Sequence, residues 1–180
     1  MTSPLTKLTV LVGGLLFLSP AHASQPPCSE APYRQFDFWV GTWQVHTQDG
    51  TYAGKNTITK AEGGCLLVER WEGAGGNTGQ SYNFYDPGLK VWRQIWVSRG
   101  GVIDYSGHWN NGAIELEGEI RYQNGTQAPF RGAWRLQDDG SVLQELKSYD
   151  KASESWQEWF TGVYTKASDS PTSSTPPANE

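Results

Sequence analysis

The feature that most constrains the fold is the regular recurrence of turn sequences between segments of alternating polar and apolar residues. Gln48-Asp49-Gly50, Asn110-Asn111-Gly112 and Gln123-Asn124-Gly125 are examples. Asp-Gly and Asn-Gly pairs adopt the positive φ angles that tight β-hairpins need. The pattern predicts ten strands joined by hairpins, at residues 39–47, 52–62, 65–74, 80–85, 90–98, 102–109, 113–122, 128–136, 141–149 and 155–165.

A meander of ten strands would leave two edge strands open to pairing with other chains unless the sheet closed on itself. We therefore predict an all-β fold, a ten-stranded antiparallel up-and-down β-barrel over residues 36–166. A two-sheet sandwich is the alternative, but Greek-key sandwiches need longer crossing connections than this sequence contains. Helical structure is expected only as a turn near residues 33–38.

Glycines inside the predicted strands allow two interpretations. They could enlarge the barrel interior, or they could mark the bends and bulges that a curved sheet needs, and we favour bends. The glycines concerned lie at positions 54, 73, 107, 118, 132 and 162.

The first residues are typical of a secretory signal peptide. Lys7 provides a positive charge, Leu8–Leu18 is mostly apolar, and Ala21-His22-Ala23 resembles a cleavage site. The apolar run is shorter than the about 20 residues that span a bilayer. We therefore expect residues 1–23 to be removed and the mature protein to be periplasmic or secreted, without a membrane span.

Two further segments flank the predicted barrel. Residues 24–35 form an N-terminal arm, and residues 167–180 lack large apolar side chains and are expected to be a disordered tail. The cysteines are Cys28 in the arm and Cys65. In an oxidising compartment they most simply form one structural disulfide, and a redox-active pair, which usually has closer spacing, is the alternative.

Charge argues against some classes of partner. The chain has 14 Lys and Arg against 19 Asp and Glu, a net charge of −5, with the basic residues scattered. Nucleic acids and anionic membrane surfaces attract basic patches, so we expect neither as a partner. The sequence does not indicate an oligomeric state.

Three consecutive predicted strands present faces with aromatic and amide side chains. If these faces point inward, they form an apolar wall with polar groups at its centre, which is typical of small-molecule sites. The same residues could simply fill a β core, and the opposite face of residues 91–97 is also apolar enough to point inward. The predicted ligand-binding residues are Glu69, Trp71, Asn83, Tyr85, Trp92, Gln94 and Trp96.

Glu69 lies between Leu67 and Trp71 on one of these faces. Burial would raise the pKa of its carboxyl group and suit it to act as a general acid or base. We favour a structural ion pair with Arg93 or Arg70, because no second positioned catalytic group can be identified. No catalytic residue is therefore assigned, and no metal site is predicted because no cluster has the spacing of zinc ligands.

The start of the predicted barrel resembles a lipocalin-type (calycin) barrel. It reads Phe36-Asp37-Phe38-Trp39-Val40-Gly41-Thr42-Trp43, and in that fold the tryptophan of Gly-x-Trp closes one end while the glycine lets the backbone pass close beneath it. The resemblance thus implies structural roles for Gly41 and Trp43. Two further motifs are Gly-Cys-Leu-Leu-x-Glu-x-Trp at 64–71 and Trp-x-Gln-x-Trp-Val at 92–97. With these motifs the chain resembles the members of a family of exported bacterial lipocalin-like domains of unknown function.

Nitrobindin, a ten-stranded haem barrel, is a more distant fold analogue. Its haem is held by a histidine in the late strands, whereas here His46 and His108 both precede the last three strands. We therefore predict no haem and no other cofactor. Lipocalins also place an arginine from the last strand over the Gly-x-Trp indole, a position for which this chain offers only Lys166.

Three functions follow from these expectations. The leading hypothesis is a non-catalytic lipocalin-like protein that binds a small apolar or aromatic molecule in the barrel cavity. The second is a barrel enzyme, such as an isomerase, cyclase or hydratase acting on an apolar substrate, which is an analogy at the level of the fold. The third is a surface glycan-binding module that uses exposed rings of Trp109, Trp156 or Trp159.

Overall fold

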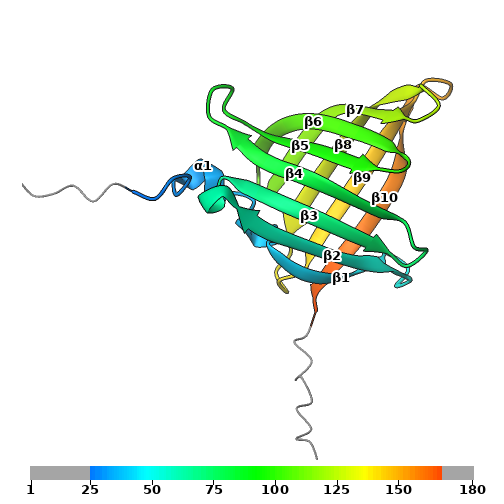
Figure 1. Cartoon of the computed structure of the whole chain (residues 1–180). Coiled ribbons are helices and arrows are strands. Elements are labelled where there is room, and N and C mark those ends of the chain that lie inside the picture. Colours follow the sequence, from blue (N-terminus) through cyan, green and yellow to red (C-terminus); the bar gives the residue numbers. More distant parts are fainter. Residues whose placement is uncertain (1–24, 168–180) are drawn as a thin grey trace, which may run out of the picture.

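The part of the chain that the structure describes forms a closed barrel of ten antiparallel strands. The computed structural model describes residues 25–167 (Figure 1). Each strand pairs with its neighbours in sequence, and the first strand pairs with the tenth, which closes the sheet. The predicted fold class is therefore confirmed. The predicted signal peptide and residues 168–180 of the predicted tail lie outside the described residues.

The elements follow the predicted order closely. Residues 39 and 40, predicted as strand, instead belong to a 3-10 turn and its C-terminal cap, because the Val40 amide donates to the Asp37 carbonyl at 3.0 Å. The helical elements are α1 (Ala31–Arg34), η1 (Asp37–Trp39) and η2 (Glu62–Gly64). The strands are β1 (Gly41–Thr47), β2 (Tyr52–Ala61), β3 (Leu66–Gly73), β4 (Thr78–Asp86), β5 (Val91–Ser98), β6 (Gly101–Asn110), β7 (Ala113–Tyr122), β8 (Gln127–Leu136), β9 (Val142–Asp150) and β10 (Ser155–Lys166).

The segment that begins with α1 lies at one end of the barrel (Figure 1). The aromatic rings of this segment plug that end. Phe36 and Trp39 are fully buried, and their rings stack with centroids 4.9 Å apart. Phe36 also meets the rings of Trp92 and Trp134 edge-on at 5.5 Å. Such edge-to-face contacts add to the free energy of burial, so this end of the barrel is closed by packed side chains.

Trp43 connects the plug to the barrel wall. Its indole is fully buried, and its Nε1 donates to the Trp39 carbonyl at 2.8 Å. Lys166, at the end of β10, places Nζ 3.8 Å from the Trp43 ring centroid and donates to the Val40 carbonyl at 2.7 Å. Gly41 has a φ of 141°, and a β-carbon there would collide with this ammonium group. Lys166 thus supplies a cation over the Gly-x-Trp indole.

Replacing Lys166 with methionine is expected to lower the free energy of unfolding by about 1 kcal/mol. The change keeps an apolar side chain over Trp43 but removes a partly exposed cation–π contact and a charged hydrogen bond. Urea unfolding followed by circular dichroism measures the effect. The control is Lys151→Met in the exposed β9–β10 turn, and an equal loss in both variants would contradict the assigned role.

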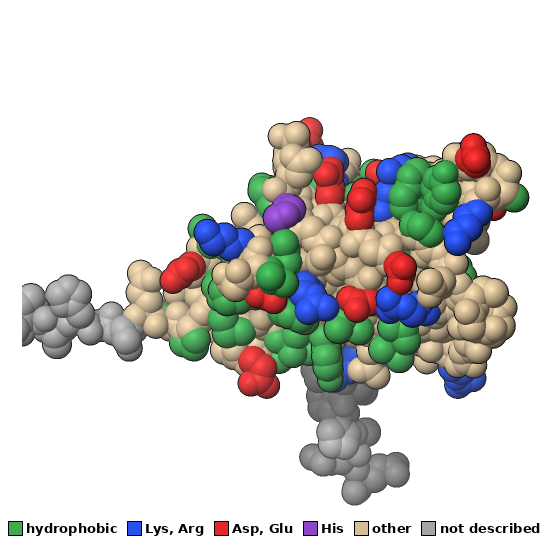
Figure 2. All heavy atoms as spheres, turned by 90° about the horizontal axis from the view of Figure 1, so that it is seen from above, with side chains coloured by type: hydrophobic (Ala, Val, Ile, Leu, Met, Phe, Trp, Pro, Cys, Tyr) green, Lys and Arg blue, Asp and Glu red, His purple; other side chains and the backbone are tan. Residues whose placement is uncertain are grey.

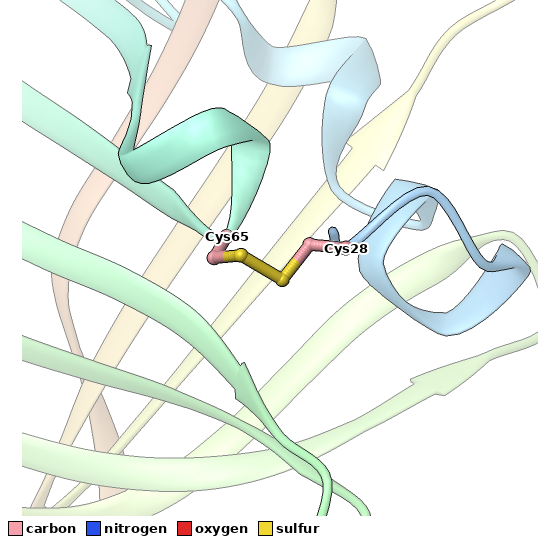
Figure 3. The surroundings of a disulfide bond; sticks show 2 residues. All are labelled: Cys28 and Cys65. Carbon is pink, nitrogen blue, oxygen red and sulfur yellow. A yellow bond between two sulfur atoms is a disulfide. The ribbon is translucent and has the colours of Figure 1, made fainter. Parts of the chain in front are cut away.

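A disulfide fastens the N-terminal arm to the barrel. Cys28, ahead of α1, is bonded to Cys65, which follows η2, with Cα atoms 5.0 Å apart (Figure 3). The predicted disulfide is confirmed. A second link is ionic, because Asp37 pairs with Lys60 of β2 at 2.8 Å. The bridge restricts the unfolded chain over 37 residues of sequence separation, which favours the plugged state.

The outer surface carries charges of both signs next to one another, as the view from above shows (Figure 2). Outward side chains form ion pairs such as Arg93 with Asp104 at 3.5 Å and Arg121 with Glu119 at 2.6 Å. Exposed pairs of this kind contribute little to stability, and their alternation avoids a single-sign patch. Within residues 25–167, no helix combines the length and the apolar character needed to cross a membrane.

Candidate ligand-binding site in the barrel interior

A cavity of about 670 Å³ occupies the half of the barrel away from the plug. Its mouth is lined by the β3–β4 turn at Gly75, Gly76 and Asn77 and by the β5–β6 turn at Arg99 and Gly100. These turns lie at the end of the barrel opposite α1 (Figure 1). Cavities of 300–1,000 Å³ are typical of small-molecule sites. The barrel wall contributes Ala53, Glu69, Trp71, Thr78, Gln94, Trp96, Ser98, Ile103, Tyr105, Gln144, Leu146, Trp159, Phe160 and Tyr164.

The three predicted faces point inward, but they extend over the full height of the barrel. Glu69, Trp71, Gln94 and Trp96 line the cavity. On β5 the opposite face points outward, since Val97 is 53% exposed. Alternation in the sequence does not tell which face of a strand points into the barrel, and the structure answers this question for these strands.

The other three predicted ligand-binding residues do not line the cavity. Trp92 lies at the plug, where its ring packs against Phe36 and its Nε1 donates to Gln35 at 3.2 Å. The Tyr85 ring meets Tyr33 of α1 at 5.1 Å. Positions four residues apart on a strand are about 13 Å apart along the wall, so one inward face serves both the plug and the cavity. Asn83 is fully buried and acts through hydrogen bonds to its neighbours.

A continuous chain of hydrogen bonds runs around the buried wall and ends at Glu69. From β6, Tyr105 donates to Gln94, which donates to Asn83. Asn83 then donates to Ser81 Oγ at 2.8 Å, and Ser81 donates to Glu69 Oε2 at 2.5 Å. The donors thus all point toward the carboxylate, which favours a single arrangement of these side chains.

The second oxygen of Glu69 is bonded from the other direction. Asn56 of β2 donates to Oε1 at 2.7 Å and also approaches the Tyr164 hydroxyl at 3.4 Å. Tyr164 in turn donates to Gln144 Oε1 at 2.6 Å. Strands β2, β9 and β10 therefore complete a polar belt that continues from β3, β4, β5 and β6.

Glu69 is buried without a cation. Its side chain is 4% exposed, and the ion pairs within residues 25–167 do not include it. The structural pair expected with Arg93 or Arg70 is thus not formed, because Arg93 points outward to Asp104. Burial raises the pKa of the Glu69 carboxyl from 4.5 to about 7, against the opposing effect of the bonds from Ser81 and Asn56. Burial also raises the pKa of the Tyr105 and Tyr164 hydroxyls.

Gly79 decides where the Trp96 ring lies. A β-carbon there would collide with the indole, so the ring packs against the wall over this glycine. Gly54 fits the favoured interpretation as a bend, since it pairs with Val45 at the register shift between β1 and β2, and a β-carbon there would collide with the Glu72 carbonyl oxygen. Gly107 and Gly118 instead allow a close approach between β6 and β7, because a β-carbon would meet the backbone of the adjacent strand.

Sequence reasoning missed the contribution of β10. The register of β10 against β9 shifts between Glu158 and Phe160, and this irregularity brings the adjacent side chains of Trp159 and Phe160 both to the cavity. Strict alternation would have put them on opposite faces. Tyr105, Gln144 and Tyr164 were also missed, although alternation of buried and exposed residues on their strands was available as a signal.

Within the described part of the chain, no group of three His, Cys, Asp or Glu side chains is arranged to hold a metal ion. The polar belt instead offers hydroxyls, amides and one carboxyl group to a bound molecule. Comparison with known proteins shows no match to a protein-family model and no match to a curated protein.

Proposed function

We propose that this protein is a lipocalin-like binding protein that holds a small, mainly apolar molecule inside the barrel. The observation behind the proposal is the 670 Å³ cavity with aromatic walls and a buried polar belt. Trp71, Trp96 and Phe160 supply flat apolar surface, and Glu69, Gln94 and Gln144 supply convergent polar groups. Apolar surface provides most of the binding free energy in such sites, while a few polar groups select the orientation.

The distribution of residues along the cavity suggests how a ligand would be oriented. Trp159 lines the cavity and is 47% exposed, whereas Glu69 and Gln94 are almost fully buried. A molecule with one polar end and a flat apolar body would place its polar end against the belt. Its body would then lie against the rings of Trp71 and Trp96, where offset or edge-to-face contacts are favourable.

We infer that the protein acts outside the cytoplasm, in the periplasm or after secretion. The disulfide between Cys28 and Cys65 supports this, since such bonds persist in oxidising compartments. A ligand-binding protein there would carry or sequester a small molecule without needing a cofactor of its own.

A second candidate function is acid–base catalysis on an apolar substrate. It is favoured by one observation, the cavity-lining Glu69 whose pKa of about 7 suits proton transfer near neutrality. Tyr105 and Gln94 lie on the same polar belt and could orient a substrate. Turnover that is abolished by Glu69→Gln while binding persists would distinguish an enzyme from a binding protein.

The proposal of surface glycan binding is less well supported. Trp109 packs on Phe38 at 5.9 Å and Trp156 packs on Tyr149 at 5.5 Å, so their rings stabilise the fold. Trp156 is also covered by Arg131, whose guanidinium lies 4.2 Å from the ring centroid. A glycan platform needs open ring faces, and the third candidate ring, Trp159, lines the interior cavity.

Binding is tested with N-phenyl-1-naphthylamine, a neutral aromatic probe whose fluorescence rises in apolar surroundings. The wild-type protein is expected to bind it, and Gly79→Ala is expected to weaken binding about tenfold because the new methyl group pushes Trp96 into the cavity. Gly88→Ala in the β4–β5 turn is the matched control. Failure of the wild type to bind, or equal weakening in both variants, would contradict the proposal. Native mass spectrometry of the exported protein would then show whether a natural ligand is retained.

A further inference from the structure

The cavity has an unbalanced charge at its inner end. Glu69 is the one charged side chain that is almost fully buried among residues 25–167. The other charged group at the cavity is Arg99, which lies in the β5–β6 turn at the mouth. The interior therefore offers an anion without a cation.

The groups that face Glu69 are neutral on every neighbouring element. Asn56 faces it from β2 and Ser81 from β4. Tyr105 and Tyr164, on β6 and β10, are neutral hydroxyls and carry no positive charge. Arg70, next to it on β3, is exposed on the outer face. Hydrogen bonds from Asn56 and Ser81 compensate part of the cost of burying the carboxylate, but neutral donors do not replace a counter-charge.

The belt also has a surplus of acceptors beside this carboxylate. Asn56 Oδ1 is buried and has no hydrogen-bond partner among the described residues, although its own Nδ2 lies 2.7 Å from Glu69. An acceptor without a donor is costly in a buried site. Asn56 does not line the cavity, so a bound molecule meets the carboxylate of Glu69 and not this oxygen. A ligand group that carries positive charge and N–H donors would supply the missing counter-charge, and a neutral or anionic group would not.

We propose that the cavity selects an aromatic organic cation, with its ammonium or amidinium group against Glu69 and its flat body against Trp71 and Trp96. This inference rests on the proposed binding function and specifies its ligand class. The surrounding rings support it, because the faces of tryptophan and tyrosine attract cations. An aromatic carboxylate would place a second anion beside Glu69 and is expected to be excluded.

The proton equilibrium of Glu69 gives the inference a distinctive pH dependence. With a pKa of about 7, the carboxyl is mostly ionised near pH 8 and mostly neutral near pH 5.5. Cation binding favours the ionised form, so affinity for a cation should fall as the pH falls through 7. Affinity for a neutral analogue should not follow the same curve, since no charge pair is formed.

The test compares 2-naphthylmethylamine, which is protonated over this range, with 2-naphthylmethanol and 2-naphthylacetate, using calorimetry at about pH 8 and about pH 5.5. For the wild type we expect the amine to bind about tenfold more tightly than the alcohol at the higher pH, with little preference at the lower. Glu69→Gln should remove the preference at both values. Glu145→Gln, an outward carboxylate on β9, should retain it.

The outcomes separate this inference from the proposed function. Equal affinity for amine and alcohol near pH 8, or a preference that survives Glu69→Gln, would overturn the cation inference while cavity binding stands. Binding of the neutral N-phenyl-1-naphthylamine without any binding of 2-naphthylmethylamine would also overturn the cation inference alone. Loss of all probe binding by the folded wild type would overturn both. If Glu69→Gln fails to fold, the pH dependence of the wild type alone decides between these results.

Discussion

Replacing Trp43 with alanine is expected to lower the free energy of unfolding by about 4 kcal/mol, the largest effect we predict for a single side chain. The indole is fully buried at the plugged end of the barrel. Its removal leaves a void, breaks the bond to the Trp39 carbonyl and takes away the ring beneath Lys166. Partial collapse of the plug would reduce the loss, since the cost depends on how far the neighbours can fill the void.

Urea unfolding, followed by tryptophan fluorescence and by circular dichroism, measures this change. Trp109→Ala is the control, because that ring is 39% exposed and packs mainly on Phe38. Its loss should cost much less, about 1 kcal/mol. Folded Trp43→Ala protein should still bind the neutral probe, since Trp43 lies away from the cavity lining. A cost at Trp43 no larger than at Trp109 would contradict its place in the plug.

The stability of the wild-type protein is expected to fall by about 3 kcal/mol between pH 4.5 and pH 7, relative to Glu69→Gln. The pKa of Glu69 rises on folding, from 4.5 to about 7, so between these values the folded state binds more protons than the unfolded state. Stability must then decrease as the pH rises through this window. Below it, both states are protonated, and above it both are ionised, so the curve levels off on each side.

The measurement is the free energy of unfolding in urea across this pH range for the wild type, Glu69→Gln and Glu145→Gln. A neutral amide at position 69 keeps the shape of the side chain and can still form hydrogen bonds with Asn56 and Ser81. Glu69→Gln should therefore be more stable than the wild type near pH 8. Glu145→Gln should follow the wild-type curve because its carboxyl is exposed. Parallel curves for all three proteins would show that Glu69 is not strained by burial.

If these measurements show that Glu69 costs stability at neutral pH, a role of this carboxyl group beyond folding is expected. An amide or apolar residue would fill the same position on β3 at lower cost. Groups with strongly shifted pKa values are found mostly at binding and catalytic sites, where function outweighs their cost in stability. Stabilisation of Glu69→Gln together with loss of its ligand preference would connect the two observations in one protein.

Much of the architecture could be read from local sequence. Turns such as Asn110-Asn111-Gly112 and the alternation between them determine strand number and order, because backbone conformation and pleat act over a few residues. The need to protect two edge strands then leads to a closed barrel. The pairing of Cys28 with Cys65 followed from their number and the expected compartment.

The site was only half predictable. Glu69, Trp71, Gln94 and Trp96 were identified because they share faces on neighbouring strands. Trp92 is on the same face as Trp96, and the sequence could not show that it contacts the plug and not the cavity. How far the plug reaches into the barrel depends on how Phe36 and Trp39 pack. That depth is a property of the assembled end of the barrel and not of one strand.

The sequence by itself determined the strands, their order, the disulfide and which side chains share a face, since these depend on local conformation and on composition. Which of the two faces points inward was decided by the closed barrel. Tertiary structure alone decided that Trp159 and Phe160 both reach the cavity, through a register shift in the pairing of β9 with β10. It also decided that Glu69 has only neutral partners, because burial and the direction of Arg93 depend on all ten strands closing together. The charge balance of a barrel interior depends on the side chains that all the strands of the closed sheet bring together, so it cannot be derived from one strand alone.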